Sequence, residues 1–431
     1  MFADCQELIS IDLSSFNTPS VTTMANMFSL CRDLTGIDLS SFGSSAVTDM
    51  YRMFFQCYVV KNIDLSNFNT YAATGTKEMF DSCQDLSGVN FSGFNTSSVT
   101  DMSQMFQFCN DLTGLDLSYF NTSSVTTMNK MFEQCRNIIN LDLSSFDTSS
   151  VVDMFQMFVN CNNLTSLDVS SFDGSSVIDL SEMFSVCADL TGLDLSSFNT
   201  PSATNMRKMF ANCNDLIELN LSNFNTSSVT NMSKMFEQAY DLTGLDLSSF
   251  DTSSVTLMTN MFTNCDSLTS LDLSNFDGSS VTSVASMFSS SSDLTSVDLS
   301  NFNAPLLTAT NNMFSYCPDL TGINLSGFDA PSVTNQSYMF AGCSSLLSLD
   351  LSSFSGSSAS STYQMFYNCN SLTSLDVSNF NTSSVTSMYQ TFTNCNSLTG
   401  LDLSSFDTSS VTNASQVFAN CNNLTSVDVS N

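Results

Sequence analysis

The chain contains no histidine and no tryptophan, and it has only 9 lysine and arginine residues against 41 acidic ones in 431 residues. Without histidine, the usual general base of a catalytic triad and the usual imidazole ligand of zinc are both missing. The net charge of −32 disfavours nucleic acid and anionic membrane surfaces, because both attract lysine and arginine. No apolar run approaches the roughly 20 residues of a membrane span. We therefore expect no nucleic-acid partner and no membrane insertion in this segment.

What the chain does contain is one unit repeated without insertion or deletion. Cysteine recurs every 26 residues from Cys5 to Cys421, with Ala239 and Ser291 as the two replacements, and this gives 17 copies. The consensus reads MFxxCxxLTxLDLSSFNTSSVTxMxx. Each short unit can bury its apolar side only against its neighbours, so a fixed period predicts a solenoid of stacked rungs. We expect residues 1–431 to form a single solenoid domain, a segment of a longer chain without its caps.

The first copy shows how each position of the unit should point. Ile11-Asp12-Leu13-Ser14 alternates apolar and polar residues, which predicts a parallel strand with Ile11 and Leu13 inward. The segment 17–20 has turn residues, and the apolar spacing over 21–28 favours a short helical or 3₁₀ turn. The predicted fold is a solenoid of about 17 rungs, each with one strand and one such turn. The stacked Phe, Leu, Met and Cys positions should form the core.

These motifs resemble a known family. The pattern LxxLDLSxF follows the leucine-rich-repeat template, and MFxxCxxL is similar to the AFxxCxxL signature of BspA-like repeats. The whole 26-residue unit resembles the bacterial surface protein repeat of the DUF285 family, over essentially the entire chain. The resemblance implies a leucine-rich-repeat solenoid displayed outside the cell and associated with adhesion to host or matrix. It implies no catalytic residues, and the replacements Thr391 and Val417 in the Met position leave the fold unaffected.

An aspartate in the predicted strand is the main candidate for binding. It should line the exposed concave face of the sheet together with serine. Its copies are Asp12, Asp38, Asp64, Asp116, Asp142, Asp168, Asp194, Asp246, Asp272, Asp298, Asp350, Asp376, Asp402 and Asp428. Like charges at strand spacing repel by about 1 kcal/mol in water, so the column needs salt, cations, raised pKa values or hydrogen bonds from serine. It is interpreted either as a solvated strand face or as a ligand surface, with Ca²⁺ a possible cation although no dedicated calcium loop is present.

The remaining repeated positions have less specific interpretations. Cysteine at one position per copy could pair with the next copy, but small replacements favour free, packed thiols. Hydroxyl columns at Thr18, Ser20 and Thr22 could form a flat array of the kind that binds ice, or they could bond nearby backbone. Sequons such as Asn121-Thr122-Ser123 would be glycosylation acceptors in a eukaryotic secretory pathway.

The sequence contains no set of residues typical of a catalytic site. The chain lacks a GxSxG motif and a phosphate-binding glycine loop, and nearly identical rungs give no carboxylate pair a special place. We therefore expect an extracellular surface protein, not an enzyme, without a cofactor. It should bind a surface or matrix protein or a glycan through the Asp/Ser face. The alternatives are a structural subunit of an extracellular filament, binding other copies of itself, and an ice-binding Ser/Thr face.

Overall fold

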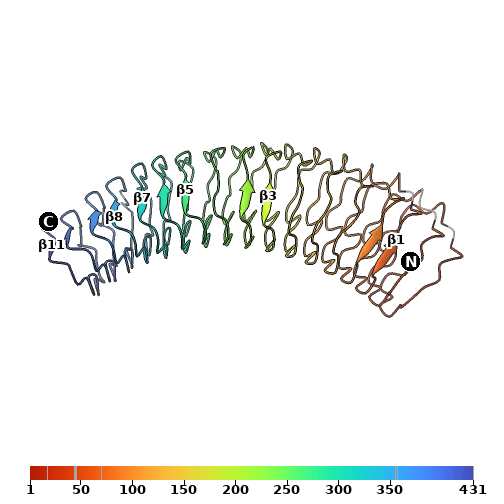
Figure 1. Ribbon diagram of the computed structural model, residues 1–431, viewed down its shortest axis with the longest axis horizontal. Coiled ribbons are helices and arrows are strands. Elements are labelled where there is room, and N and C mark those ends of the chain that lie inside the picture. Colours follow the sequence, from red (N-terminus) through yellow and green to blue (C-terminus); the bar gives the residue numbers. More distant parts are fainter. Residues whose placement is uncertain (17, 43–45, 69, 355, 357, 431) are drawn as a thin grey trace. The chain divides into compact units, whose positions relative to one another are not determined.

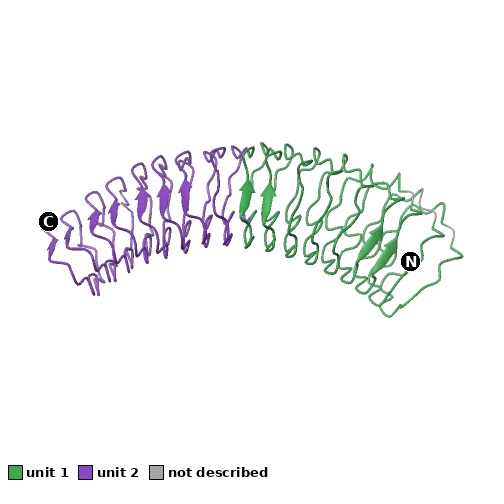
Figure 2. Ribbon diagram, viewed as in Figure 1, with its two compact units in different colours: residues 1–205, 209–224 green, residues 206–208, 225–431 purple. Residues whose placement is uncertain are grey.

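The computed structural model describes residues 1–16, 18–42, 46–68, 70–354, 356 and 358–430. Contacts divide the chain into two compact units, one of residues 1–205 and 209–224 and the other of residues 206–208 and 225–431 (Figure 2). Each unit is a parallel β-solenoid in which successive copies of the repeat stack as rungs (Figure 1). The predicted solenoid class is therefore confirmed within each unit.

Short strands form the first side of the rung. Unit 1 contains β1 Asn62–Asp64, β2 Gly88–Asn90, β3 Gly192–Asp194 and β4 Glu218–Asn220. Unit 2 contains β5 Ser270–Asp272, β6 Ser296–Asp298, β7 Gly322–Asn324, β8 Ser348–Asp350, β9 Ser374–Asp376, β10 Gly400–Asp402 and β11 Ser426–Asp428. The pairs β1–β2, β3–β4, β8–β9 and β10–β11 and the triple β5–β6–β7 are all parallel.

The strand register equals the sequence period. Asn62 pairs with Gly88 and Ile63 pairs with Val89, a shift of one copy, and the other pairs repeat this shift. The central residue of each strand, such as Ile63, points toward the core, while the aspartate after it is exposed. The alternation of apolar and polar residues along the strand therefore correctly predicted which side chains are buried.

A second parallel ladder runs along each rung outside the strands. It consists of single bridges, such as Thr23 to Asp49 and Asp49 to Gly75, again one copy apart. The bridged position occurs in 16 copies, because the seventeenth copy, residues 417–431, does not include it. Backbone hydrogen bonds thus join neighbouring rungs on two sides.

The helical or 3₁₀ turn predicted over residues 21–28 and their copies is not found among the described residues, so this prediction is corrected. After the bridge at Thr23, every second residue donates its N–H to the next rung: Met24 to Asp49 O at 2.8 Å and Phe28 to Met53 O at 2.9 Å. The residues between them close turns within the rung, as Met27 does to Met24 O at 3.1 Å. A helix would direct all these N–H groups along its own chain and leave the rung edges unpaired.

This turn segment needs two left-handed residues per copy, and most of them are not glycine. In the first complete turn they are Asn26 with φ 57° and Leu30 with φ 64°. Asparagine tolerates this region of backbone space better than most residues do, because its short amide bonds the local backbone. Val186, with φ 63°, is β-branched and is the least suited residue at its position, where copies on both sides carry Asn160 and Asn212.

Replacing Val186 with asparagine should therefore stabilise the chain. We expect the free energy of unfolding to rise by about 1 kcal/mol, because the strain of a β-branched residue at positive φ is relieved. Val186 is half-buried, so little apolar contact is lost. Urea unfolding followed by circular dichroism measures the change. An equal or lower midpoint for Val186→Asn would show that the left-handed turn carries no strain.

Identical side chains stack along the core, as the sequence predicts. Phe132, Phe158 and Phe184 stack with ring centroids 5.7 and 5.5 Å apart and planes within 5° of parallel. The cysteines are free, and fourteen thiols donate to the carbonyl of the phenylalanine 29 residues earlier at 2.9 to 3.2 Å. Burial raises the pKa of these thiols, to about 12 for Cys213, which keeps them protonated and able to donate. Ser291 makes the same bond, to Phe262 O at 2.8 Å, so a hydroxyl can replace the thiol.

One hydroxyl column that the sequence placed on the surface is buried. Thr122 is fully buried; its Oγ1 donates to Asp147 O and accepts the N–H of Asp147, both at 2.8 Å. Thr96 and Thr148 repeat this arrangement one copy before and after. Thr122 is the fifth copy of the Thr18 position. The prediction that this position forms part of a flat hydroxyl array on the surface is therefore wrong, because its hydroxyls join neighbouring rungs in the interior.

Candidate functional site

The strand-face aspartate column comprises the fourteen aspartates predicted above, and eight of them are the last residue of an assigned strand. Its members are exposed, apart from the partly covered Asp298. Where strands are assigned, parallel pairing places successive carboxylates about 4.8 Å apart along the sheet. The structure thus places Asp272 beside Asp298, Asp350 beside Asp376 and Asp402 beside Asp428 in unit 2. Whether they bind a ligand remains a prediction.

Hydrogen bonds from serine to the aspartate carboxylates stabilise these neighbouring like charges. Every aspartate of the column accepts the backbone N–H of the serine two residues later, at 2.8 to 3.1 Å. Some also accept the serine hydroxyl, as Asp142 does from Ser144 at 2.6 Å. Bonds from the side chain and backbone of Ser144 hold the pKa of Asp142 below its usual value. Hydrogen bonds of this kind lower the pKa of twelve of the fourteen aspartates and favour their ionised form. Each of the fourteen also closes a local turn through the serine N–H.

Asparagine replaces aspartate at three positions of the column and keeps the turn. Asn90, Asn220 and Asn324 accept the same serine N–H at 3.1 to 3.2 Å. Asn324 also donates to Asp298 across the pair β6–β7 at 3.3 Å. Since the turn needs only the acceptor oxygen, the negative charge of the other fourteen is not required by the backbone.

The face is open and not a closed pocket. Residues of β5, β6 and β7, including Asp272, Asp298 and Asn324, line a shallow hollow of about 520 Å³ in unit 2. No three acidic or cysteine side chains converge on one point among the described residues. Binding of Ca²⁺ by this face stays a prediction.

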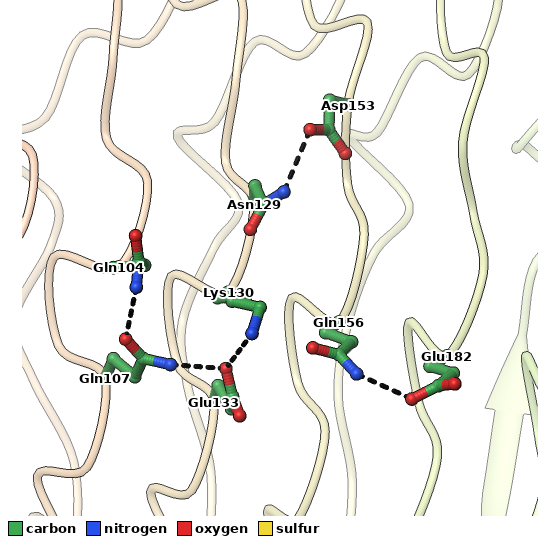
Figure 3. A network of polar contacts seen from close by, with 8 residues as sticks. All are labelled: Gln104, Gln107, Asn129, Lys130, Glu133, Asp153, Gln156 and Glu182. Carbon is green, nitrogen blue, oxygen red and sulfur yellow. Dashed lines mark hydrogen bonds and ion pairs between the residues drawn. The ribbon is translucent and has the colours of Figure 1, made fainter.

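A different polar network lies on the turn segment of unit 1, and sequence reasoning missed it (Figure 3). Lys130 contacts Glu133 at 3.2 Å, Gln104 donates to Gln107 at 2.6 Å, and Gln107 donates to Glu133. Nearby copies add Gln156 to Glu182 at 2.6 Å and Asn129 to Asp153 at 3.0 Å. Most of these residues are uncharged Gln and Asn or acidic residues at variable positions of the repeat, so the consensus gives no signal for the network.

Asp81 lies in the same turn column as Gln107 and Glu133. Burial raises its pKa to about 6, the hydroxyl of Ser82 offsets part of this, and the nearby negative Glu78 adds to it. Glu78 is itself paired with Arg52 at 2.5 Å. A carboxyl whose folded pKa exceeds its unfolded value favours folding when it is protonated. Asp81 therefore stabilises the fold below about pH 4 and loses this contribution as the pH rises through 6.

The variant Asp81→Asn should consequently be more stable than the wild type at pH 7, by about 2 kcal/mol after allowance for screening. This advantage should shrink as the pH falls from 7 to 4, because the wild-type carboxyl becomes protonated over that range. Urea unfolding of both proteins at several pH values measures the difference. A difference that stays constant with pH would contradict the raised pKa.

Among the described residues, no helix is long and apolar enough to cross a bilayer. A search of curated protein sequences finds no match. Among solved structures, the chain is similar to a leucine-rich repeat protein from Bacteroides ovatus, with 16% identity and a TM-score of 0.41 over 85% of this chain and 87% of that one. It is also similar to a leucine-rich cell surface protein from Faecalibacterium prausnitzii, with 16% identity and a TM-score of 0.31 over 86% and 83%.

The family comparison is more specific. The family described as "Mycoplasma protein of unknown function, DUF285" matches residues 1–113, 74–190, 136–243, 179–296, 204–320, 240–348, 287–399 and 348–431. These overlapping matches span the chain, and they follow the repeat whose strands, turns and thiols are described above. The chain therefore belongs to the DUF285 family.

Proposed function

We infer that this chain is an extracellular surface protein that binds a partner through the strand-face aspartate column. The observation that carries the proposal is the row of exposed carboxylates that accept serine hydrogen bonds, which lower the pKa of aspartates such as Asp142 and Asp168. Because asparagine serves the backbone equally well, the retained charge points to a role at the surface. A fixed anionic row complements a basic partner surface and accelerates its encounter.

The partner class is best matched by a protein or glycoprotein of the cell surface or matrix that presents basic residues. The hydroxyls that would form an ice-binding face are largely committed to backbone carbonyls, as Thr48 is to Thr22 O and Thr126 is to Thr100 O. This commitment, together with the burial of the Thr122 column, favours macromolecular binding over ice binding.

Two variants of equal charge test the proposal. One changes Asp246, Asp272, Asp350 and Asp376 of the strand face to asparagine. The control changes Asp251, Asp277, Asp329 and Asp407, which lie in the turn after the strand, where Asp251 accepts the N–H of Ser253 at 3.0 Å in the same way. Both proteins lose four charges, but only the first loses them from the proposed surface.

Beads coated with each protein are applied to immobilised extracellular-matrix extract, with calcium and with a chelator. We expect the strand-face variant to lose most of the wild-type adhesion and the turn variant to retain it, with added salt weakening all binding. Equal loss in both variants, or no adhesion by the wild type, would contradict the proposal. Light scattering of the free protein separates adhesion from the filament alternative, since polymers at rising concentration would favour self-assembly.

A further inference from the structure

Four departures from the repeat meet at one corner of unit 1. Gly93 and Tyr119 occupy the position where other copies mostly carry serine or asparagine. Tyr71 stands where other copies have serine or proline, and Phe91 stands where they have leucine or valine. Gly93, Tyr71 and Tyr119 line a hollow of about 380 Å³, and Phe91 lies in the core next to it. In so regular a chain, the convergence of these departures on one place marks that place as different from the other rungs.

The corner at Gly93 differs from most other copies in how close its backbone comes to the preceding rung. In other copies this position fills the corner and bonds the preceding rung, as Ser41 does to Leu13 O at 2.8 Å and Ser171 does to Leu143 O at 3.1 Å. At Gly93 the backbone comes so close to the preceding rung that a Cβ would lie 1.9 Å from the carbonyl oxygen of Ser66. No other residue fits there without a shift of the backbone.

The base of the hollow is rigid. The Phe91 ring packs edge-on against Phe94 at 5.4 Å and against Phe120 at 5.0 Å, so the larger ring fills the core under the corner. Phe94 lines the hollow and is itself buried. A preformed base of this kind lowers the entropy that a bound ligand would otherwise lose through ordering of the site.

The lining combines aromatic walls with uncharged polar groups. Tyr71 is 65% exposed and Tyr119 is 49% exposed, which is unusual for side chains of this size. Asn67 and Asn95 also line the hollow, and Oδ1 of Asn95 already accepts the N–H and the hydroxyl of Ser97 at 2.9 and 2.6 Å. These bonds fix the Asn95 amide, so its N–H groups are the part that can serve a ligand. Among the described residues, none of those that line the hollow is charged.

A second glycine corner in unit 2 provides an internal comparison. A Cβ at Gly327 would lie 2.0 Å from the carbonyl oxygen of Ser300, so the backbone approach is the same. The described residues that line the hollow at Gly327 are Gly327 itself, three serines, Asp329 and Asn379, and none of them is aromatic. The glycine corner therefore does not require tyrosine.

We propose that the hollow at Gly93 binds an uncharged sugar residue of a glycan. A pyranose ring presents apolar C–H groups to an aromatic face and hydroxyls to amides and serine, which is the combination found here. The absence of charge in the lining disfavours phosphorylated or acidic ligands. Ser66, which lines the hollow, donates its N–H to Asp64 of the strand-face aspartate column, but no aspartate of the column lines the hollow among the described residues. The proposal does not depend on the function of the column.

The test titrates the whole chain with neutral hexasaccharides of β-1,4-linked glucose, xylose, mannose and N-acetylglucosamine, by calorimetry. We expect saturable binding of at least one of them, with a Kd of about 0.1–1 mM. The double variant Tyr71→Ser/Tyr119→Ser restores the usual serine at both positions and should weaken binding by at least about tenfold. Tyr316→Asn removes a 55% exposed tyrosine in unit 2 and should leave binding unchanged.

Absence of binding by the wild type to every hexasaccharide at about 10 mM would overturn the proposal. Unchanged affinity in the double variant would overturn it as well. Circular dichroism melting checks that the double variant folds; should it not, each single reversion is titrated, and full affinity in both would contradict the site. Loss of matrix adhesion by the strand-face variants has no bearing on this result.

Discussion

Replacing Phe158 with alanine should lower the free energy of unfolding by about 3–5 kcal/mol, the largest effect expected from a single substitution in this chain. The Phe158 ring is fully buried between Phe132 and Phe184, with centroid distances of 5.7 and 5.5 Å. Its removal leaves a cavity that both neighbours line, and stacked rings cannot collapse into it without shifting the rungs. Urea unfolding monitored by circular dichroism measures the loss.

The control for this variant is Phe108→Ala. Phe108 is 37% exposed on a left-handed turn residue and takes no part in the core stack, so its loss should cost less than about 1 kcal/mol. Equal destabilisation by the two variants would contradict the conclusion that the stacked rings dominate the core.

Replacing Thr122 with valine should cost about 2–3 kcal/mol, although the two side chains have nearly the same shape. Valine would leave the N–H and the carbonyl of Asp147 without the partner that Oγ1 provides at 2.8 Å to each. Thr122→Ser keeps the hydroxyl and should cost only about 1 kcal/mol for the lost methyl group. Unfolding midpoints of the three proteins test the order, and a valine variant as stable as the serine variant would show that the buried hydroxyl does not join the rungs.

Much of this fold could be predicted from the period of the sequence. Alternation at Ile63-Asp64-Leu65 predicted inward and outward side chains, and one copy of shift predicted the register of Asn62 with Gly88. The turn segment could not be predicted in the same way. Apolar spacing over 21–28 is shared by a helix and by consecutive turns, and the choice depends on N–H groups such as that of Met24 reaching Asp49 in the next rung.

The candidate site was predicted only in part. The position of the strand-face aspartate column follows from the repeat, but its ionisation depends on the Ser144 N–H and hydroxyl reaching Asp142, which no pattern of residue types specifies. The hollow at Gly93 was not predicted because a consensus contains only the residues that the copies share. Its signal was present in the sequence as exceptions, Tyr71 and Tyr119, that could be placed together only once the rungs were stacked.

The most direct test of the ionised aspartate column is a pH titration of side-chain carboxyl carbons by NMR, with Asp→Asn variants for assignment. Asp142, Asp168 and Asp194 should titrate below the usual value of 3.8, because serine hydrogen bonds favour the charged form over the repulsion of neighbours. With depressed folded values, their contribution to stability is present above about pH 4 and is lost as the pH falls through the folded pKa. Titration of these carboxyls above 3.8 would mean that repulsion dominates, and it would contradict a column held ionised for binding.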